Sequence, residues 1–223
     1  MRGRDIKRYS YEYADLYLIA TFPSKHYDIE EYPAIKNYLL SFGLERLEQT
    51  GKEYKVNGEK IKARKKTNNK WFETQDSISY WEDFNKPKIL WSETMRVHKH
   101  NNERFPRFSF DYQGLLTDKT CFFATGMNLE WITCFLNSYI GQYLCSKHVS
   151  ILDNGGYLMQ KIFIEKIPLP KSTSYIDELC KKQIKIPTKG QETEIDRKIY
   201  EIYGLTNAEI IFIEAQKQLV TRI

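Results

Sequence analysis

Residues 120–144 read TCFFATGMNLEWITCFLNSYIGQYL, and this stretch decides the fold. The apolar run at 120–125 is typical of a short strand. Gly126 interrupts the run, and Asn128 is a good N-cap for a helix that begins directly after it. Helical spacing then relates the apolar positions Ile132, Phe135, Leu136, Tyr139, Ile140, Tyr143 and Leu144. We therefore predict a strand followed by one central core helix.

Two segments upstream of this core are also typical of strands. Residues 88–93 form a short, mainly apolar run that reads KILWSE. Residues 107–112 alternate, with Phe108, Phe110 and Tyr112 on one face and Arg107, Ser109 and Asp111 on the other. This alternation predicts a strand with one buried face and one polar face.

Other segments extend the pattern in both directions. Leu16–Ala20 is a strand-like apolar run, and Pro33–Phe42 fits a helix because proline suits the first helical turn. Leu158–Ile164 is typical of a further strand. Pro168 and Pro170 must end it, since proline cannot continue a ladder.

The remainder of the chain has the signals of helices. Helical spacing up to Gly204 relates Ile195, Ile199 and Ile202. Thr206 and Glu209 then form a capping box for a last helix. We expect an α+β fold, in which residues 1–170 hold a mixed, largely antiparallel sheet with helices. Residues 171–223 form a C-terminal helical extension that ends in a helical pair.

Composition indicates an ordinary globular protein with a mildly basic character. The chain has 223 residues, 41% of them hydrophobic, a net charge of +5 and a pI near 8.8. Its four cysteines, at 121, 134, 145 and 180, show no CxxC spacing, which argues against a zinc ribbon or a disulfide framework. No apolar run has the length of a membrane span, and the N-terminus lacks the apolar stretch of a signal peptide. We therefore expect a cytoplasmic protein that does not enter a membrane.

Positive charge is concentrated between Gly51 and Lys70, where there are eight Lys or Arg and two Glu. Such side chains suit the phosphates of a nucleic acid, whose attraction does not depend on base sequence. The candidate backbone contacts are Lys60, Lys62, Arg64, Lys65, Lys66 and Lys70, together with Lys99 further along the chain. A solvated loop without a partner is the competing interpretation.

A second set of side chains suits the reading of base edges. Glutamine pairs bidentately with adenine and arginine with guanine, so the candidate readers are Gln75, Arg96, Arg104 and Arg107. Candidates for stacking or for the close approach of a loop are Trp71, Gly155, Gly156 and Tyr157. The competing interpretations are a core position for the tryptophan and a plain turn for the glycines.

Signals for catalysis are weak. Glu53-Tyr54-Lys55 matches the ExK end of a nuclease motif with Asp28 as the upstream acid, but a chain that is 28% charged produces such a triplet by chance. His98 and His100 lack a nearby carboxylate or thiolate for a metal site. We therefore predict no catalytic residue and no metal ligand.

Several segments, taken in their order, resemble a known family. They are RGRDIKRY at 2–9, KWFETQDSISYWEDFNKPKILWSE at 70–93, LNS at 136–138, KIFIEKIPLP at 161–170 and EIDRKIYEIYGLTNAEIIFIE at 194–214. The chain resembles, over almost its whole length, the TaqI-like C-terminal specificity domain of N6-adenine DNA methyltransferases and type IIG restriction-modification enzymes. No single segment is diagnostic, and the order of the segments carries the resemblance.

The resemblance implies a DNA target recognition domain at residues 1–170. Residues 1–9 would be the junction with an upstream methyltransferase domain of the same polypeptide, and double-stranded DNA would be the partner. The chain has no Asn-Pro-Pro-Tyr type motif for a flipped adenine and no Gly-rich loop for S-adenosylmethionine. We therefore expect no cofactor in this chain. S-adenosylmethionine, and Mg²⁺ if the parent also cleaves DNA, would belong to the parent enzyme. A stand-alone metal-dependent nuclease and a protein-interaction module are the alternatives.

Overall fold

The computed structural model describes residues 1–96, 104–153 and 155–216, which gather into two compact units. Unit 1 comprises Met1–Asp15 and Glu82–Ile223, and unit 2 comprises Leu16–Trp81. The division that we predicted at residue 170 does not match these units. The helices beyond residue 170 pack on the core helix of unit 1 and therefore belong to it.

The main sheet of unit 1 has three antiparallel strands. Its central strand β3 (Lys88–Ser92) pairs on one side with β5 (Phe108–Asp111) and on the other with β6 (Cys121–Thr125). Trp91 lies opposite both Phe108 and Phe122, and its ring stacks on that of Phe122 with centroids 5.7 Å apart. All three strands were predicted, and the fold class, α+β with antiparallel sheets and C-terminal helices, is confirmed.

The prediction of a polar face on β5 was wrong. All four of its residues are buried, and Ser109 and Asp111 are both fully inaccessible to solvent. Asp111 is neutralised by the equally buried ammonium group of Lys88 on β3. Its carboxylate also accepts hydrogen bonds from the backbone N–H groups of Gln113 (2.9 Å) and Leu115 (3.0 Å). A charged residue at an alternating position is thus buried here because it has a partner on the next strand.

A second antiparallel sheet in unit 1 has the order β4-β8-β7, formed by β4 (Thr94–Arg96), β7 (Ser150–Ile151) and β8 (Gly156–Leu158). The strand predicted at Leu158–Ile164 is therefore wrong over most of its length. The chain turns at Gln160 into the short helix α5 (Lys161–Ile164). Short apolar runs are ambiguous, because periodicity alone does not distinguish a buried strand from a turn of helix.

The predicted central helix is two helices, α3 (Leu129–Asn137) and α4 (Tyr139–His148). Ser138 between them has extended backbone angles, and its hydroxyl accepts a hydrogen bond from the Gly141 N–H at 3.0 Å. A Cβ on Gly141 would lie 2.1 Å from the Phe135 carbonyl oxygen. The tight turn between the two helices therefore requires glycine at position 141.

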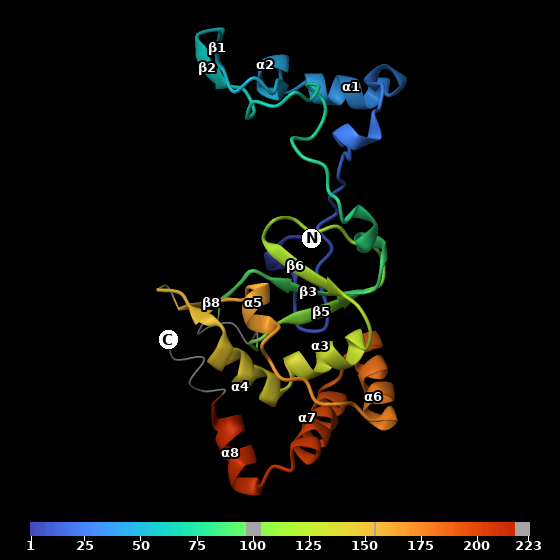
Figure 1. The fold of residues 1–223 in the computed structure, drawn as a ribbon, viewed down its shortest axis with the longest axis vertical. Coiled ribbons are helices and arrows are strands. Elements are labelled where there is room, and N and C mark those ends of the chain that lie inside the picture. Colours follow the sequence, from blue (N-terminus) through green and yellow to red (C-terminus); the bar gives the residue numbers. More distant parts are fainter. Residues whose placement is uncertain (97–103, 154, 217–223) are drawn as a thin grey trace. The chain divides into compact units, whose positions relative to one another are not determined.

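Three further helices complete unit 1: α6 (Ser174–Lys185), α7 (Lys189–Tyr203) and α8 (Asn207–Ala215). In Figure 1, α3 and α4 lie beneath the main sheet, and α6, α7 and α8 lie on the far side of α3 and α4. The predicted helical pair is α7 and α8, and the capping box of Thr206 and Glu209 is confirmed. None of the helices in the described ranges has the length and apolarity that a bilayer span requires.

The N-terminal segment is part of the core of unit 1. It contains the short 3₁₀ turn η1 (Gly3–Asp5), and its side chains at Ile6 and Tyr9 are buried. The Tyr9 N–H donates to the carbonyl of Phe108 at 2.9 Å, which attaches the segment to β5. The segment predicted as a domain junction is thus attached to unit 1 by a backbone hydrogen bond and by apolar burial.

Unit 2 is a small body with little regular structure. Its elements are η2 (Pro23–Lys25), η3 (Ile29–Glu31), α1 (Pro33–Leu40), α2 (Leu44–Leu47), β1 (Glu53–Val56) and β2 (Glu59–Lys62), and η4 (Trp81–Asn85) follows at its end. The helix predicted at Pro33–Phe42 is confirmed as α1. The strand predicted at Leu16–Ala20 is wrong, because this run is irregular and pairs with no strand in the described part of the chain.

Candidate nucleic-acid interface

The basic segment Gly51–Lys70 contains the antiparallel hairpin of β1 and β2 in unit 2, which carries three of its eight Lys and Arg residues and both of its Glu residues. The turn residues Asn57 (φ 50°) and Gly58 (φ 87°) both have positive φ, as a two-residue hairpin turn requires. In Figure 1 the hairpin and α1 lie at opposite ends of unit 2, with α2 between them. The hairpin was not predicted. Its Asn-Gly turn between two alternating runs is the signal that could have found it.

The register of the hairpin sorts its side chains onto two faces. Glu53 lies opposite Lys62, and Lys55 lies opposite Lys60. Because alternate residues of a strand point to the same face, these four side chains share one face. All four are exposed, and we call this surface the lysine face.

The opposite face of the hairpin rests on unit 2. It carries Tyr54 and Ile61, which are paired and half-buried. The Tyr54 hydroxyl donates to the carboxylate of Glu48 and lies 3.1 Å from the Thr50 hydroxyl oxygen. These contacts hold the hairpin by one face and leave the lysine face toward solvent.

No side chain of the lysine face has a hydrogen-bond or ion-pair partner within the described ranges. Cβ atoms of directly opposite residues are about 4.5–5.5 Å apart, so Lys55 and Lys60 repel each other. Glu53 and Lys62 also form no ion pair, although they are direct neighbours. The face therefore holds an excess of uncompensated positive charge.

Polar contacts join the segment after the hairpin to the segment before it. The side-chain N–H₂ of Gln49 donates to the carbonyls of Lys70 (3.0 Å) and Glu73 (2.8 Å), and its oxygen accepts from the Thr67 hydroxyl (2.7 Å). Gln49 is buried, so its amide has exchanged water for three protein partners. This amide fixes the base of the hairpin.

Arg64, like Gln49, joins the segment before the hairpin to the segment after it. Its guanidinium donates to the backbone carbonyls of Leu47 (2.7 Å), Glu73 (2.9 Å) and Trp71. Burial lowers the pKa of Arg64, but the group remains a cation. The phosphate contact predicted for Arg64 is corrected to a structural position, because each nitrogen of its guanidinium donates to a backbone carbonyl of unit 2.

The other residues predicted on this segment differ in their exposure to solvent and in their contacts. Lys65 and Lys66 are exposed and extend the charge of the lysine face along the chain. The Lys70 ammonium lies 5.6 Å from the ring centroid of Phe72. Trp71 is half-buried with its ring edge-on to Phe72, and Gln75 is also half-buried. Unit 2 thus holds seven of the predicted residues, Lys60, Lys62, Arg64, Lys65, Lys66, Lys70 and Gln75, together with Trp71.

The arginines predicted to read bases lie in unit 1. Arg96 is exposed at the end of β4, and its carbonyl accepts from both terminal nitrogens of Arg107 at 3.2 Å. Lys99, His98 and His100 lie outside the described residues. The structure therefore brings Arg96 and Arg107 together but assigns them to a different unit from Gln75.

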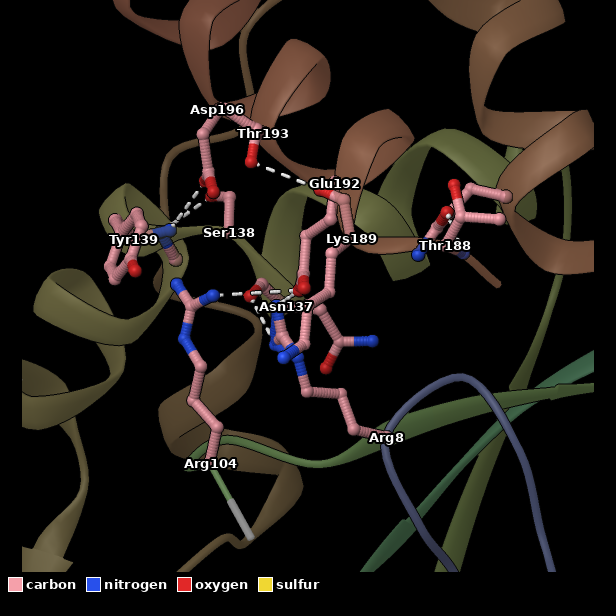
Figure 2. Close-up of polar contacts among 12 residues, drawn as sticks. Arg8, Arg104, Asn137, Ser138, Tyr139, Thr188, Lys189, Glu192, Thr193 and Asp196 are labelled. Carbon is pink, nitrogen blue, oxygen red and sulfur yellow. Dashed lines mark hydrogen bonds and ion pairs between the residues drawn. The ribbon is translucent and has the colours of Figure 1, made fainter. Parts of the chain in front are cut away.

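Arg104 is held inside unit 1 by a cluster of charges that the sequence did not indicate. Figure 2 shows Arg8 and Arg104 converging on Glu192 of α7. The Arg104 guanidinium carbon lies 3.6 Å from the ring centroid of Tyr139, and Arg8 also donates to the Asn137 carbonyl at 2.6 Å. The predicted base contact of Arg104 is corrected to a core contact, because this side chain already pairs with a carboxylate and an aromatic face.

Asp196 of α7 completes this cluster at the start of α4. Its carboxylate accepts a hydrogen bond from the Tyr139 N–H at 2.8 Å and thereby caps that helix. Burial raises the pKa of Asp196 to about 6, against the opposing effects of Arg104, the Tyr139 N–H and Arg8. Burial also disfavours the charged form of Arg8, and for this cation it lowers the pKa, to about 10. The cluster joins the N-terminal segment, the break between α3 and α4, and α7.

Part of the loop at residues 155–157, which we predicted to approach a partner, lies in the core of unit 1. Tyr157 is buried on β8, and its ring stacks on Phe105 with centroids 4.2 Å apart. Gly156 is buried in the same strand, whereas Gly155 lies in the turn before it with φ of 77°. The expectation of a stacking contact is therefore corrected for Tyr157, which fills the space between β8 and Phe105.

The residues of the nuclease alternative lie on two different elements of unit 2. Asp28 caps η3 by accepting a hydrogen bond from the Glu30 N–H at 3.0 Å. Glu53 and Lys55 lie on the lysine face. Among the residues that the structure describes, no three His, Cys, Asp or Glu side chains gather as metal ligands.

Comparison with models of known protein families found no match, and comparison with curated protein sequences found none.

Proposed function

We propose that this chain is the sequence-specific DNA target recognition module of a bacterial type IIG restriction-modification enzyme or N6-adenine DNA methyltransferase. In this proposal the chain binds double-stranded DNA and positions it for a methyltransferase domain of the same parent polypeptide. S-adenosylmethionine and any Mg²⁺ are then requirements of the parent, and the chain itself acts by binding and not by bond-making.

The lysine face is the observation that carries the proposal. Lys55 and Lys60 stand directly opposite each other without a counter-charge, which costs stability in the absence of a partner. A polyanion removes this repulsion, and the release of its counterions supplies affinity. Lys65 and Lys66 continue the positive charge beyond the hairpin.

A salt-dependence measurement tests the proposal. Fluorescence anisotropy of a labelled duplex, titrated with the full chain at several KCl concentrations, gives the slope of log K against log salt. Each lost phosphate contact lowers the magnitude of this slope by about 0.9. Lys60→Ala with Lys62→Ala should therefore lower it by about 1.8 and weaken binding to all duplexes alike.

Lys171→Ala with Lys185→Ala is the matched control, because both of these lysines are exposed in unit 1 and carry the same charge. It should leave the slope unchanged. Equal slopes for both double variants and the wild type would remove the lysine face from the interface. Absence of duplex binding at low salt would overturn the proposed function.

A further inference from the structure

An acidic residue stands on the lysine face. Glu53 shares this face with Lys55, Lys60 and Lys62, and its side chain is exposed. It lies directly opposite Lys62, yet the two form no ion pair, and no other described residue binds its carboxylate. The carboxylate is therefore available to a partner of the face.

A carboxylate limits what the lysine face contacts at this position. Ionised Glu53 only accepts hydrogen bonds, whereas a phosphate offers no donor and repels it. Base edges do offer donors, since cytosine presents its N4 amino group and adenine its N6 amino group in the major groove. An acid on a surface that binds DNA thus fits a base edge and not the phosphate backbone.

The dimensions of the hairpin match the same groove. The two paired strands β1 and β2 lie about 4.8 Å apart, as neighbouring strands do. The major groove of B-DNA is about 12 Å wide and admits a two-stranded ribbon. The tip at Asn57 and Gly58 carries no large side chain, and the opposite face of the hairpin is fixed to unit 2 through Tyr54.

We infer that the β1–β2 ribbon enters the major groove with its lysine face toward the base pairs, and that Glu53 selects a base by accepting a hydrogen bond from its exocyclic amino group. Cytosine is the expected base, because glutamate accepts from cytosine N4 in the usual pairing. Lys55, Lys60 and Lys62 then donate to neighbouring phosphates. This inference rests on the proposed function and moves base selection from the arginines of unit 1 to the ribbon.

Selection of binding sites from a randomised duplex pool tests the inference. The wild-type chain, Glu53→Gln and Glu59→Gln are each taken through selection, and the enriched sequences are compared. Glu59 is the matched control, since it is exposed on the same hairpin but pairs with Val56 on the opposite face. Both variants remove one negative charge, so a purely electrostatic effect is equal in the two.

The expected result is a change of motif in Glu53→Gln alone. The wild-type preference for cytosine at one position, roughly tenfold or more, should relax or shift toward adenine, which glutamine reads bidentately. A wild-type preference for adenine at that position, strengthened in the variant, would identify adenine N6 as the partner, because the glutamine carbonyl still accepts from N6 and its amide also donates to N7. Matching circular dichroism and melting curves for the three proteins show that folding is unaffected.

Other outcomes overturn the inference in distinguishable ways. An identical motif for all three proteins, or wild-type binding that enriches no motif, means that the ribbon does not select bases, while DNA binding by the lysine face stands. A chain that binds no duplex in low salt loses the proposed function and this inference together.

Discussion

Lys62 and Arg64 are two positions apart in the sequence and have opposite roles in the structure. Lys62 is exposed on the lysine face, whereas the guanidinium of Arg64 is bound by three backbone carbonyls. Arg104 is a similar case, because it pairs with Glu192 inside unit 1. Net charge per segment therefore does not identify which cations a partner meets, whereas the lysines of the hairpin are exposed and have no ion-pair partner among the described residues.

Asp196 makes a residue-scale prediction about pH. Its pKa is about 6 in the folded chain and roughly 3.9 in an unfolded one. Between these two pH values the folded chain therefore keeps a proton on Asp196 that the unfolded chain has released. The contribution of Asp196 to the free energy of unfolding should therefore fall as the pH rises from about 4 to 6, by at most about 3 kcal/mol. Asp196→Asn keeps an oxygen acceptor for the Tyr139 N–H and should abolish this part of the pH dependence.

Urea unfolding followed by tryptophan fluorescence between pH 4 and 7 checks this prediction. Asp153→Asn is the control, since Asp153 is an exposed aspartate in the turn before β8. The control should keep the wild-type pH dependence. If Asp196→Asn keeps it as well, the buried carboxylate is not the group that titrates.

At the scale of elements, the break between α3 and α4 depends on one glycine. The Gly141 Cα approaches the Phe135 carbonyl so closely that a Cβ would lie 2.1 Å from its oxygen. Gly141→Ala should therefore destabilise unit 1 by about 2 kcal/mol or more, the cost typical of overpacking, although alanine is the better helix former.

Gly190→Ala is the matched control for this element. Gly190 also lies in a helix, α7, but an added Cβ there would meet nothing within 4 Å. It should be neutral or stabilise by up to about 1 kcal/mol, as helix propensity predicts. Thermal and urea unfolding of both variants measure the difference, and equal stabilities would contradict the close approach at Gly141.

At the scale of the whole molecule, we predict that the isolated chain neither methylates nor cuts DNA. The sequence has no Asn-Pro-Pro-Tyr type motif and no Gly-rich cofactor loop, and we propose that Glu53 and Lys55 of the lysine face bind DNA. Transfer of a labelled methyl group from S-adenosylmethionine and cleavage of supercoiled plasmid with Mg²⁺ measure the two activities. Cleavage by the wild type that disappears in Glu53→Ala would favour the nuclease alternative instead.

The sequence by itself determined the elements whose signals are local. The strands at 88–93 and 120–125, the helix that begins at Pro33 and the capping box of the last helix depend on neighbouring residues, so their patterns sufficed. The Asn-Gly turn of the β1–β2 hairpin is an equally local signal, although no hairpin was predicted there.

Tertiary structure alone decided which polar groups are paired within the protein and which remain exposed. The burial of Asp111 depends on Lys88 from another strand, and the position of Arg104 depends on Glu192, 88 residues away. Such ion pairs produce no periodic pattern in the sequence, because the partner of a buried charge can come from any segment that the fold brings next to it. The division into two units and the lysine face have the same origin, since both depend on which segments pack together and which side chains packing leaves without a counter-charge.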